Sequence, residues 1–182
     1  MTLHSTSTRA AAWILFGIML AASLPAPAQD VAAATPEEAK WLTFMREEEK
    51  LARDVYAALH ERWRLRIFDN IARSESRHFA AAGVLLDRYD IADPAKGLPA
   101  GVYLDANLAS LYQKLLDKGM LSLKDALEVG VMIEKQDIAD LEEALKAAEK
   151  TDIKTVYANL LAGSLNHLES FENLLEAVVK NE

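Results

Sequence analysis

The sequence contains no cysteine, and this absence excludes several kinds of protein. Within the chain there can be no disulfide bond, no thiolate catalyst and no iron–sulfur cluster. A lipoprotein anchor, which needs an N-terminal cysteine, is excluded as well. Without a covalent cross-link, the fold must be stabilised by its apolar core, or by that core together with a bound metal.

Turn-forming residues are also scarce, with only 7 glycines and 5 prolines among 182 residues. No segment alternates apolar and polar residues as a half-buried strand does, and no hairpin turn separates two such segments. We therefore predict an all-α fold.

The only long apolar run lies at the N-terminus, where residues 10–24 follow a head whose single charge is Arg9. At about 15 residues this run is short for a membrane span, and it is followed by Pro25-Ala26-Pro27-Ala28, which ends in small residues that signal peptidase accepts. We expect residues 1–28 to be a cleaved secretory signal. The mature protein would then be periplasmic or secreted, with no stable membrane anchor. The alternative is an uncleaved anchor.

The formal net charge is −8, and loss of Arg9 with the signal would make the mature chain more negative still. An acidic protein is a poor non-specific ligand for nucleic acid, because the phosphates repel it. We therefore expect no nucleic-acid partner.

Capping residues and apolar spacing predict where helices begin and end. Thr35-Pro36-Glu37-Glu38 is a capping box with proline at the first helical position, and it predicts a helix that runs to about Glu61. After a tight turn, apolar residues at steps of three and four predict a second helix that ends before Asp93. Three more helices are predicted at about residues 105–118, from Ser122 to about 150, and from a cap at Thr151 or Asp152 nearly to the C-terminus.

The lengths of the connections predict the topology. Short turns join the first long helix to the second and the third to the fourth, so each pair should form an antiparallel hairpin. The long middle connection can cross from one hairpin to the other. We therefore predict a ferritin-like four-helix bundle with a long crossover that carries a short extra helix. Residues 29–40 would be a linker and the start of the first helix, and residues 41–182 the bundle domain.

Charged residues interrupt the apolar face of each long helix. On the first helix this face has Glu49 where an apolar residue is expected, and a neighbouring face has Glu48 in the same situation. The second helix carries Glu75-x-x-His78, whose carboxylate and imidazole lie one turn apart on one face. The remaining two long helices carry Glu134, Asp137 and His167.

These polar positions lie at similar heights, because residues equidistant from a hairpin turn lie side by side. At about 1.5 Å per residue, the members of each hairpin fall within about two turns of one level. Four carboxylates and two imidazoles in an apolar interior are costly unless they are paired or bind metal. We therefore predict a metal site, in which two divalent ions would balance four carboxylates. The alternatives are a hydrogen-bonded polar layer, or an outward orientation of some of these residues.

At these residues the sequence resembles the ferritin-like di-metal carboxylate superfamily, and most closely its rubrerythrin-like branch. Glu49-x-x-Ala52-Arg53-Asp54-Val55-Tyr56 is similar to the first-helix motif, which favours Glu49 over Glu48. Glu75-x-x-His78 matches the second-helix motif, and Glu134-x-x-Asp137 resembles the paired acids of the third helix. Residues 46–56 also resemble the opening of an uncharacterised ferritin-like family, domain of unknown function 2202 (DUF2202).

The sequence departs from the superfamily pattern on the fourth helix, where Glu-x-x-His is expected. His167 fits, but Ser164 stands in place of the glutamate. Asp137 would then supply the missing carboxylate from a neighbouring helix. The alternative is one weak metal position, which would leave a mononuclear or empty site. Because rubrerythrins receive electrons through a cysteine-ligated iron, redox turnover in this chain would need an external electron donor.

The resemblance implies a di-iron centre held by Glu49, Glu75, His78, Glu134, Asp137 and His167, and these ligand types would also accept Mn or Zn. The implied activity is oxidation of Fe(II) by O₂ or peroxide in metal handling or oxidative stress. Tyr56 either donates a hydrogen bond or an electron to this site or is an ordinary core residue. The alternative function is an exported binding or structural module, with a structural zinc or no metal. Nothing indicates a cage-forming surface, and a homodimer is the assembly that we consider.

The predicted signal makes the mature N-terminus testable. We expect cleavage after Ala28, so that mass spectrometry of protein purified from the cell envelope finds Gln29 as the first residue. Recovery of a chain that still begins at Met1 would contradict both the exported location and the mature length.

Overall fold

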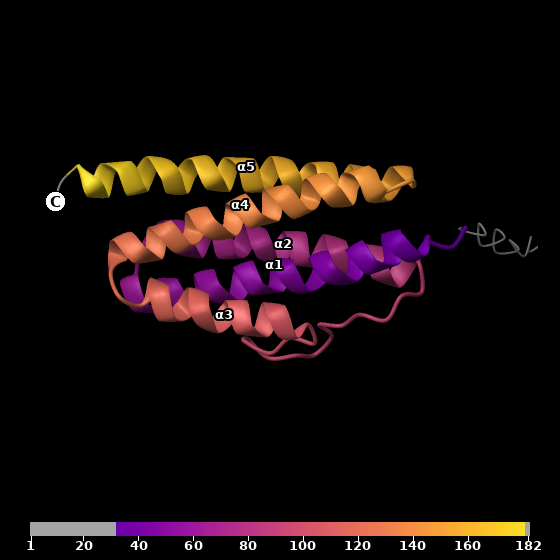
Figure 1. Cartoon of the computed structure of the whole chain (residues 1–182), viewed down its shortest axis with the longest axis horizontal. Helices are drawn as coiled ribbons and strands as arrows, with labels where there is room; N and C mark the ends of the chain where they lie inside the picture. Colours follow the sequence, from indigo (N-terminus) through magenta and orange to yellow (C-terminus); the bar gives the residue numbers. More distant parts are fainter. Residues whose placement is uncertain (1–31, 181–182) are drawn as a thin grey trace, which may run out of the picture. The chain divides into compact units, whose positions relative to one another are not determined.

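The computed structural model describes residues 32–180 of the chain (Figure 1). These residues form five α-helices, joined by turns and one longer connection, and contain no strand. The helices are α1 (Pro36–Trp63), α2 (Arg66–Arg88), α3 (Ala106–Gly119), α4 (Leu123–Ala147) and α5 (Thr151–Val179). The all-α prediction is therefore confirmed. The predicted signal, residues 1–28, lies outside the described residues. None of the described helices is long and apolar enough to cross a membrane.

The start of α1 is fixed by the predicted capping box. The Thr35 side chain accepts a hydrogen bond from the Glu38 amide (3.1 Å), and the Glu38 carboxylate accepts one from the Thr35 amide (2.9 Å). The helix ends at Trp63 and its C-cap is Arg64, whose left-handed backbone (φ 55°) reverses the chain. Only Arg64 and Leu65 separate α1 from α2, so the two helices turn back along each other.

Helices that are joined by short turns pack along each other, as the sequence predicts. α1 lies against α2, and α4 lies against α5. Contacts between α1 and α4 and between α2 and α5 join the two pairs, while α3 packs on α1 and α4 (Figure 1). The four long helices therefore enclose a shared interior.

That interior contains two separate apolar clusters. One contains residues from Leu51 to Leu59 on α1, together with Phe68, Ile71, Leu127, Ile133 and Phe171. The other contains Leu42, Met45, Leu85, Leu86, Leu141, Tyr157 and Leu160. Along each long helix, the predicted polar residues lie between the part that enters one cluster and the part that enters the other. A single polar layer therefore separates the two apolar clusters.

The connection between α2 and α3 is held against α1 by charged side chains. Arg46 donates two hydrogen bonds to Asp93 (3.1 and 2.8 Å), and the fully buried Lys50 donates to Asp54 (2.6 Å). Lys50 and Asp54 also bind the connection further along the chain. Lys50 donates to the Pro99 carbonyl (2.8 Å), and Asp54 accepts from the Gly101 amide (3.1 Å) and the Tyr103 hydroxyl (3.0 Å). One face of α1 thus anchors the connection while another faces the interior.

Two predicted details are wrong at the ends of the later helices. We expected Thr151 or Asp152 to cap the last helix, but its N-cap is Lys150, which makes no side-chain capping bond. Asp152 instead accepts hydrogen bonds from the side chains of Arg88 and Tyr89 on the opposite hairpin (2.7 Å each). In addition, α4 ends at Ala147, a few residues before the predicted end near residue 150, whereas α2 ends at Arg88, before Asp93 as predicted.

The Glu38 side chain makes hydrogen bonds to the turn before α5, where the predicted side-chain cap is missing. Besides closing the capping box of α1, its carboxylate accepts hydrogen bonds from the amides of Glu149 (2.8 Å) and Lys150 (2.9 Å) in the turn between α4 and α5. The side chain is 1 % exposed. One buried carboxylate therefore ties the beginning of α1 to the turn of the other hairpin.

We expect Glu38→Ala to lower the free energy of unfolding by about 2–4 kcal/mol at pH 7, because three partly buried amides lose their acceptor. Burial alone would raise the pKa of Glu38, but the hydrogen bonds from Thr35, Lys150 and Glu149 outweigh it and lower this pKa. The stabilisation is therefore present above the pKa of the unfolded chain and is lost as the pH falls through the lower folded pKa. Urea unfolding should show the difference from wild type narrowing below about pH 4.

Glu37→Ala is the matched control, because Glu37 is exposed and its ion pair with Lys40 (3.3 Å) lies at the surface. It should change stability by no more than about 0.5 kcal/mol. Equal effects of the two variants would contradict the role assigned to Glu38.

Candidate metal centre

Each of the four long helices contributes side chains to the polar layer. They are Glu49 from α1, Glu75 and His78 from α2, Glu134 and Asp137 from α4, and Ser164 and His167 from α5. Glu49 and Glu134 are 1 % exposed, and Glu75 is 2 % exposed. The structure therefore brings all six residues predicted as ligands into one buried layer.

Five of these six residues form two groups that share Glu75. The first group is Glu49, Glu75 and His78, and the second is Glu75, Glu134 and His167. In each group the ligand atoms lie within 4.8 Å of one another, so these acidic and histidine groups could hold a metal ion. Glu75 lies between the two imidazoles, with Oε2 at 2.7 Å from Nδ1 of His78 and Oε1 at 2.7 Å from Nδ1 of His167.

The two groups are arranged similarly on either side of Glu75. Glu49 Oε2 lies 3.4 Å from Nδ1 of His78, and Glu134 Oε2 lies 3.5 Å from Nδ1 of His167. The two imidazole rings are stacked, with their centroids 5.6 Å apart and their planes 26° apart. Each half of the centre thus has one terminal carboxylate, one imidazole and a share of Glu75.

Many of the oxygen and nitrogen atoms that could bind a metal in this layer lack a hydrogen-bond partner. Within residues 32–180, the buried side-chain atoms without such a partner include both oxygens of Glu49, Oε1 of Glu75, Oδ1 of Asp137 and Nδ1 of His78 and His167. The short Glu75–imidazole contacts lack the alignment of hydrogen bonds. Unpaired buried carboxylates and imidazoles are costly, and cations that bind oxygen and nitrogen would remove that cost. The residues present therefore fit a bound metal ion.

The electrostatics of the layer reflect the same crowding. Burial, followed by the charges of Asp137 and Glu75, raises the pKa of Glu49 well above its usual value. Burial also raises the pKa of Asp137, to about 8. Glu75 behaves differently: burial would raise its pKa, but the imidazoles of His167 and His78 lower it to about 2. Glu75 is therefore the carboxylate that keeps its charge most readily.

Asp137 lies outside both groups and contacts the residue that departs from the superfamily pattern. The fully buried Ser164 hydroxyl donates a hydrogen bond to Asp137 Oδ2 (2.5 Å), while Oδ1 of Asp137 has no partner. The α4 carboxylate thus meets the α5 position at which the superfamily pattern has a glutamate. This contact fits the predicted compensation, although the metal-ligand role of Asp137 stays a prediction.

Tyr56 combines the two interpretations that the sequence left open. Its hydroxyl donates a hydrogen bond to Glu134 Oε1 (2.6 Å), so it contacts a candidate ligand directly. Its ring is fully buried and packs against Phe171 (centroids 5.2 Å apart) and Phe68 (6.5 Å). The apolar cluster therefore holds the ring, and the ring in turn positions the carboxylate.

Gly163 is a residue of the centre that sequence reasoning missed. A Cβ atom at this position would lie 2.7 Å from Cε1 and Nε2 of His78. The imidazole thus packs directly on the backbone of α5, which only a glycine permits. The sequence feature that could have indicated this close packing is the Gly163-Ser164 pair, two small residues one turn before His167.

Glu48 and Glu49 occupy different places. Glu49 belongs to one of the two groups, as the first-helix resemblance favoured, and Glu48 belongs to neither. Glu48 is nevertheless buried (5 % exposed), and its Oε2 has no hydrogen-bond partner. It faces Asp137 and Asp140 of α4, whose charges act on it.

Comparison with known proteins places this arrangement in a family. Residues 38–180 match the family described as an uncharacterized protein domain, DUF2202. The uncharacterized protein MJ0754 of Methanocaldococcus jannaschii is 50% identical over 139 residues, which are 76% of this chain and 75% of that protein. The crystal structure of hypothetical protein MJ0754 from Methanococcus jannaschii has a TM-score of 0.78 and 46% identity, covering 86% of each chain.

A second solved structure, a DUF305 fragment from Deinococcus radiodurans, has a TM-score of 0.59 and covers 80% of this chain and 99% of that one. At 16% identity this is a likeness of fold alone. The assignment rests on the family match over residues 38–180 and on the 50% identity to MJ0754 over 76% of this chain. On this basis the protein belongs to the DUF2202 family.

Proposed function

We propose that this protein is a ferritin-like metal-binding protein whose buried centre holds two metal ions. In this proposal α1, α2, α4 and α5 form the four-helix bundle, and the α2-to-α4 connection is the crossover that carries α3. The packing of α1 on α2 and of α4 on α5 supports this topology, as do the contacts between the two pairs.

The observation that carries the proposal is the pair of ligand groups that share Glu75. A shared carboxylate between two similar sets of ligands suits two neighbouring cations, one on each side. Glu49 and His78 would hold one ion, and Glu134 and His167 the other, with Asp137 as an additional carboxylate. The unpartnered oxygens and nitrogens of these side chains support the same arrangement.

Iron is the metal that we propose, because carboxylate oxygens combined with imidazoles suit Fe or Mn, and would also accept Zn. When bound, two ferrous ions supply the electrons that reduce O₂ or peroxide. The proposed activity is therefore Fe(II) oxidation in the cell envelope, in metal handling or oxidative stress. Continued turnover would depend on an external electron donor, because the chain has no cysteine to build a second iron site.

The chain's own residues would orient the ligands and keep water out. Tyr56 holds one oxygen of Glu134, which leaves the other oxygen facing His167. Ser164 likewise holds one oxygen of Asp137. The apolar clusters above and below the layer limit the access of water, which strengthens the electrostatic interactions inside it.

We expect anaerobic Fe(II) to bind at two ions per chain and to raise the melting temperature, because the ligands converge only in the folded protein. At a free concentration 100 times the dissociation constant, the rise should be roughly 5–10 °C. Exposure to oxygen should then produce ferric absorption. Metal analysis, thermal unfolding and absorption spectroscopy measure these three outcomes.

Glu75→Ala/His78→Ala should abolish the metal-dependent rise. Its matched control is His60→Ala/Glu61→Ala, which removes the same residue types near the end of α1 and should keep the rise. An equal response of both double variants would place the metal elsewhere. Metal binding without ferric absorption would support a purely structural metal instead of the oxidative function.

We expect Asp137→Ala to lower the bound metal from two ions per chain towards one, if Asp137 supplies the carboxylate missing at position 164. Adding Ser164→Glu in that background should restore the second ion, because residue 164 lies one turn before His167. Metal per chain and ferric absorption are the measurements.

The control for this series is Glu142→Ala, which removes an exposed carboxylate from the same helix and should still bind two ions. Two bound ions in Asp137→Ala would show that the compensation idea is wrong.

A further inference from the structure

A second set of carboxylates lies beside the centre and is not part of either ligand group. Glu48 of α1 faces Asp137 and Asp140, which lie one turn apart on α4. The side chain of Asp140 lies within hydrogen-bonding reach of the Glu48 carboxyl. Because Glu48 is 5 % exposed and its Oε2 has no partner, it is a buried acid without a counter-charge. Such a group needs either a proton or a cation.

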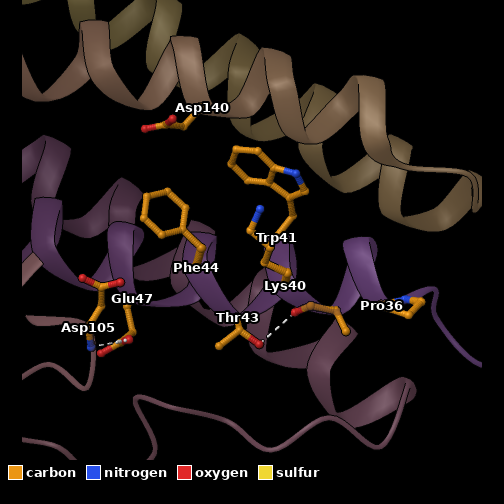
Figure 2. Close-up of a pocket in the computed structure, with 9 residues that line it drawn as sticks. Pro36, Lys40, Trp41, Thr43, Phe44, Glu47, Asp105 and Asp140 are labelled. Carbon is orange, nitrogen blue, oxygen red and sulfur yellow. Dashed lines mark hydrogen bonds between the residues drawn. The ribbon is translucent and has the colours of Figure 1, made fainter. Parts of the chain in front are cut away.

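A surface cavity of about 620 Å³ opens next to this set. Figure 2 shows Asp140 on α4 facing the cavity across from Phe44 and Trp41 of α1, with Glu47 and Asp105 on another part of its wall. Three carboxylates line the cavity against a single ammonium group, that of Lys40. The cavity is therefore an acidic recess that attracts cations.

Asp140 connects this recess to the interior. It lines the cavity and also contacts Glu48, while Glu48 in turn faces Asp137. The charge of Asp137 then acts on Glu49 and Glu75 of the centre. The carboxylates thus form a continuous series from the surface to the ligands. The apolar clusters flank the layer at both ends and offer a cation no comparable ligands.

We propose that Asp140 and Glu48 form the access route for divalent cations, which pass from the acidic recess through these two carboxylates to Asp137 and the centre. This inference rests on the proposed metal-binding function and adds to it a path with named residues. A cation that moves between carboxylates is never left in the apolar interior without a ligand, which keeps the barrier to its passage low. The two residues act in transit and hold no ion at equilibrium.

The test measures how fast metal enters, separately from how much is bound. Apoprotein is mixed with Co(II) in a stopped-flow instrument, and the visible absorption of the bound ion is followed. We expect Glu48→Gln and Asp140→Asn each to slow loading by about tenfold, because each removes one charge from the route. Both variants should still bind as much Co(II) per chain at equilibrium as wild type.

Asp117→Asn is the matched control, because it removes one carboxylate charge at an exposed position on α3. It should load at the wild-type rate. Lys40→Gln removes the single positive charge of the recess and should speed loading, so slower loading in this variant would contradict the proposal.

Three further results would overturn the route. Wild-type loading rates in both Glu48→Gln and Asp140→Asn would mean that cations enter elsewhere, while the proposed function would stand. Loss of one bound Co(II) at equilibrium in Glu48→Gln would make Glu48 a resident ligand instead of a transit residue. If wild type itself bound no Co(II), the proposed function would fail, and the route with it.

Discussion

The interaction on which the rest of this structure depends is the mutual repulsion of carboxylates that are buried in one layer. Glu49, Glu75, Glu134 and Asp137 are all at least nine-tenths buried, and two imidazoles are the nearest groups that can carry positive charge. Two imidazolium charges cannot balance four carboxylates. Without a cation, protons must make up the difference. The pKa of Asp137 agrees with this, because burial raises it to about 8. The layer therefore has a strong affinity for positive charge built into it.

The apolar clusters explain why this repulsion persists in the folded chain. Each long helix buries apolar residues on both sides of the layer, so the polar residues cannot reach solvent without unpacking one cluster or the other. Burial of apolar side chains is the main favourable term in folding, and it offsets the cost of desolvating the acids. Gly163 contributes by letting the His78 imidazole approach the backbone of α5. The energy that orients the candidate ligands thus comes from packing above and below them.

The first helix joins the centre to the connection between α2 and α3. Glu49 faces the interior, while Arg46, Lys50 and Asp54 hold the chain between α2 and α3. The charged residues near the middle of α1 therefore make different contacts, according to the face of the helix on which each residue lies. A mutation that loosens the connection would also shift α1, and with it Glu49 and Glu48. Stability of the connection and geometry of the centre are coupled through this one helix.

Much of the fold could be predicted from local sequence patterns, because their causes are local. The Thr35–Glu38 capping box satisfies amides within one turn, so its effect does not depend on the rest of the molecule. Apolar spacing likewise predicted five helices in the correct order, with an error of a few residues at the end of α4. Where a long-range contact competes, the local pattern failed: Asp152 binds Arg88 and Tyr89 instead of capping α5.

The polar residues that interrupt the apolar faces could be identified from the sequence, because helical periodicity and distance from the turns depend only on position along the chain. How those residues face one another depends on the packing of the helices. Glu75 lies between the two imidazoles, Tyr56 reaches Glu134, and Ser164 meets Asp137, and each of these contacts joins residues from different helices. Glu48 and Glu49 are neighbours in sequence, yet one joins the ligand groups and the other faces Asp140. Periodicity could not separate their roles, because the angle at which α1 meets α2 and α4 sets which neighbours each side chain reaches.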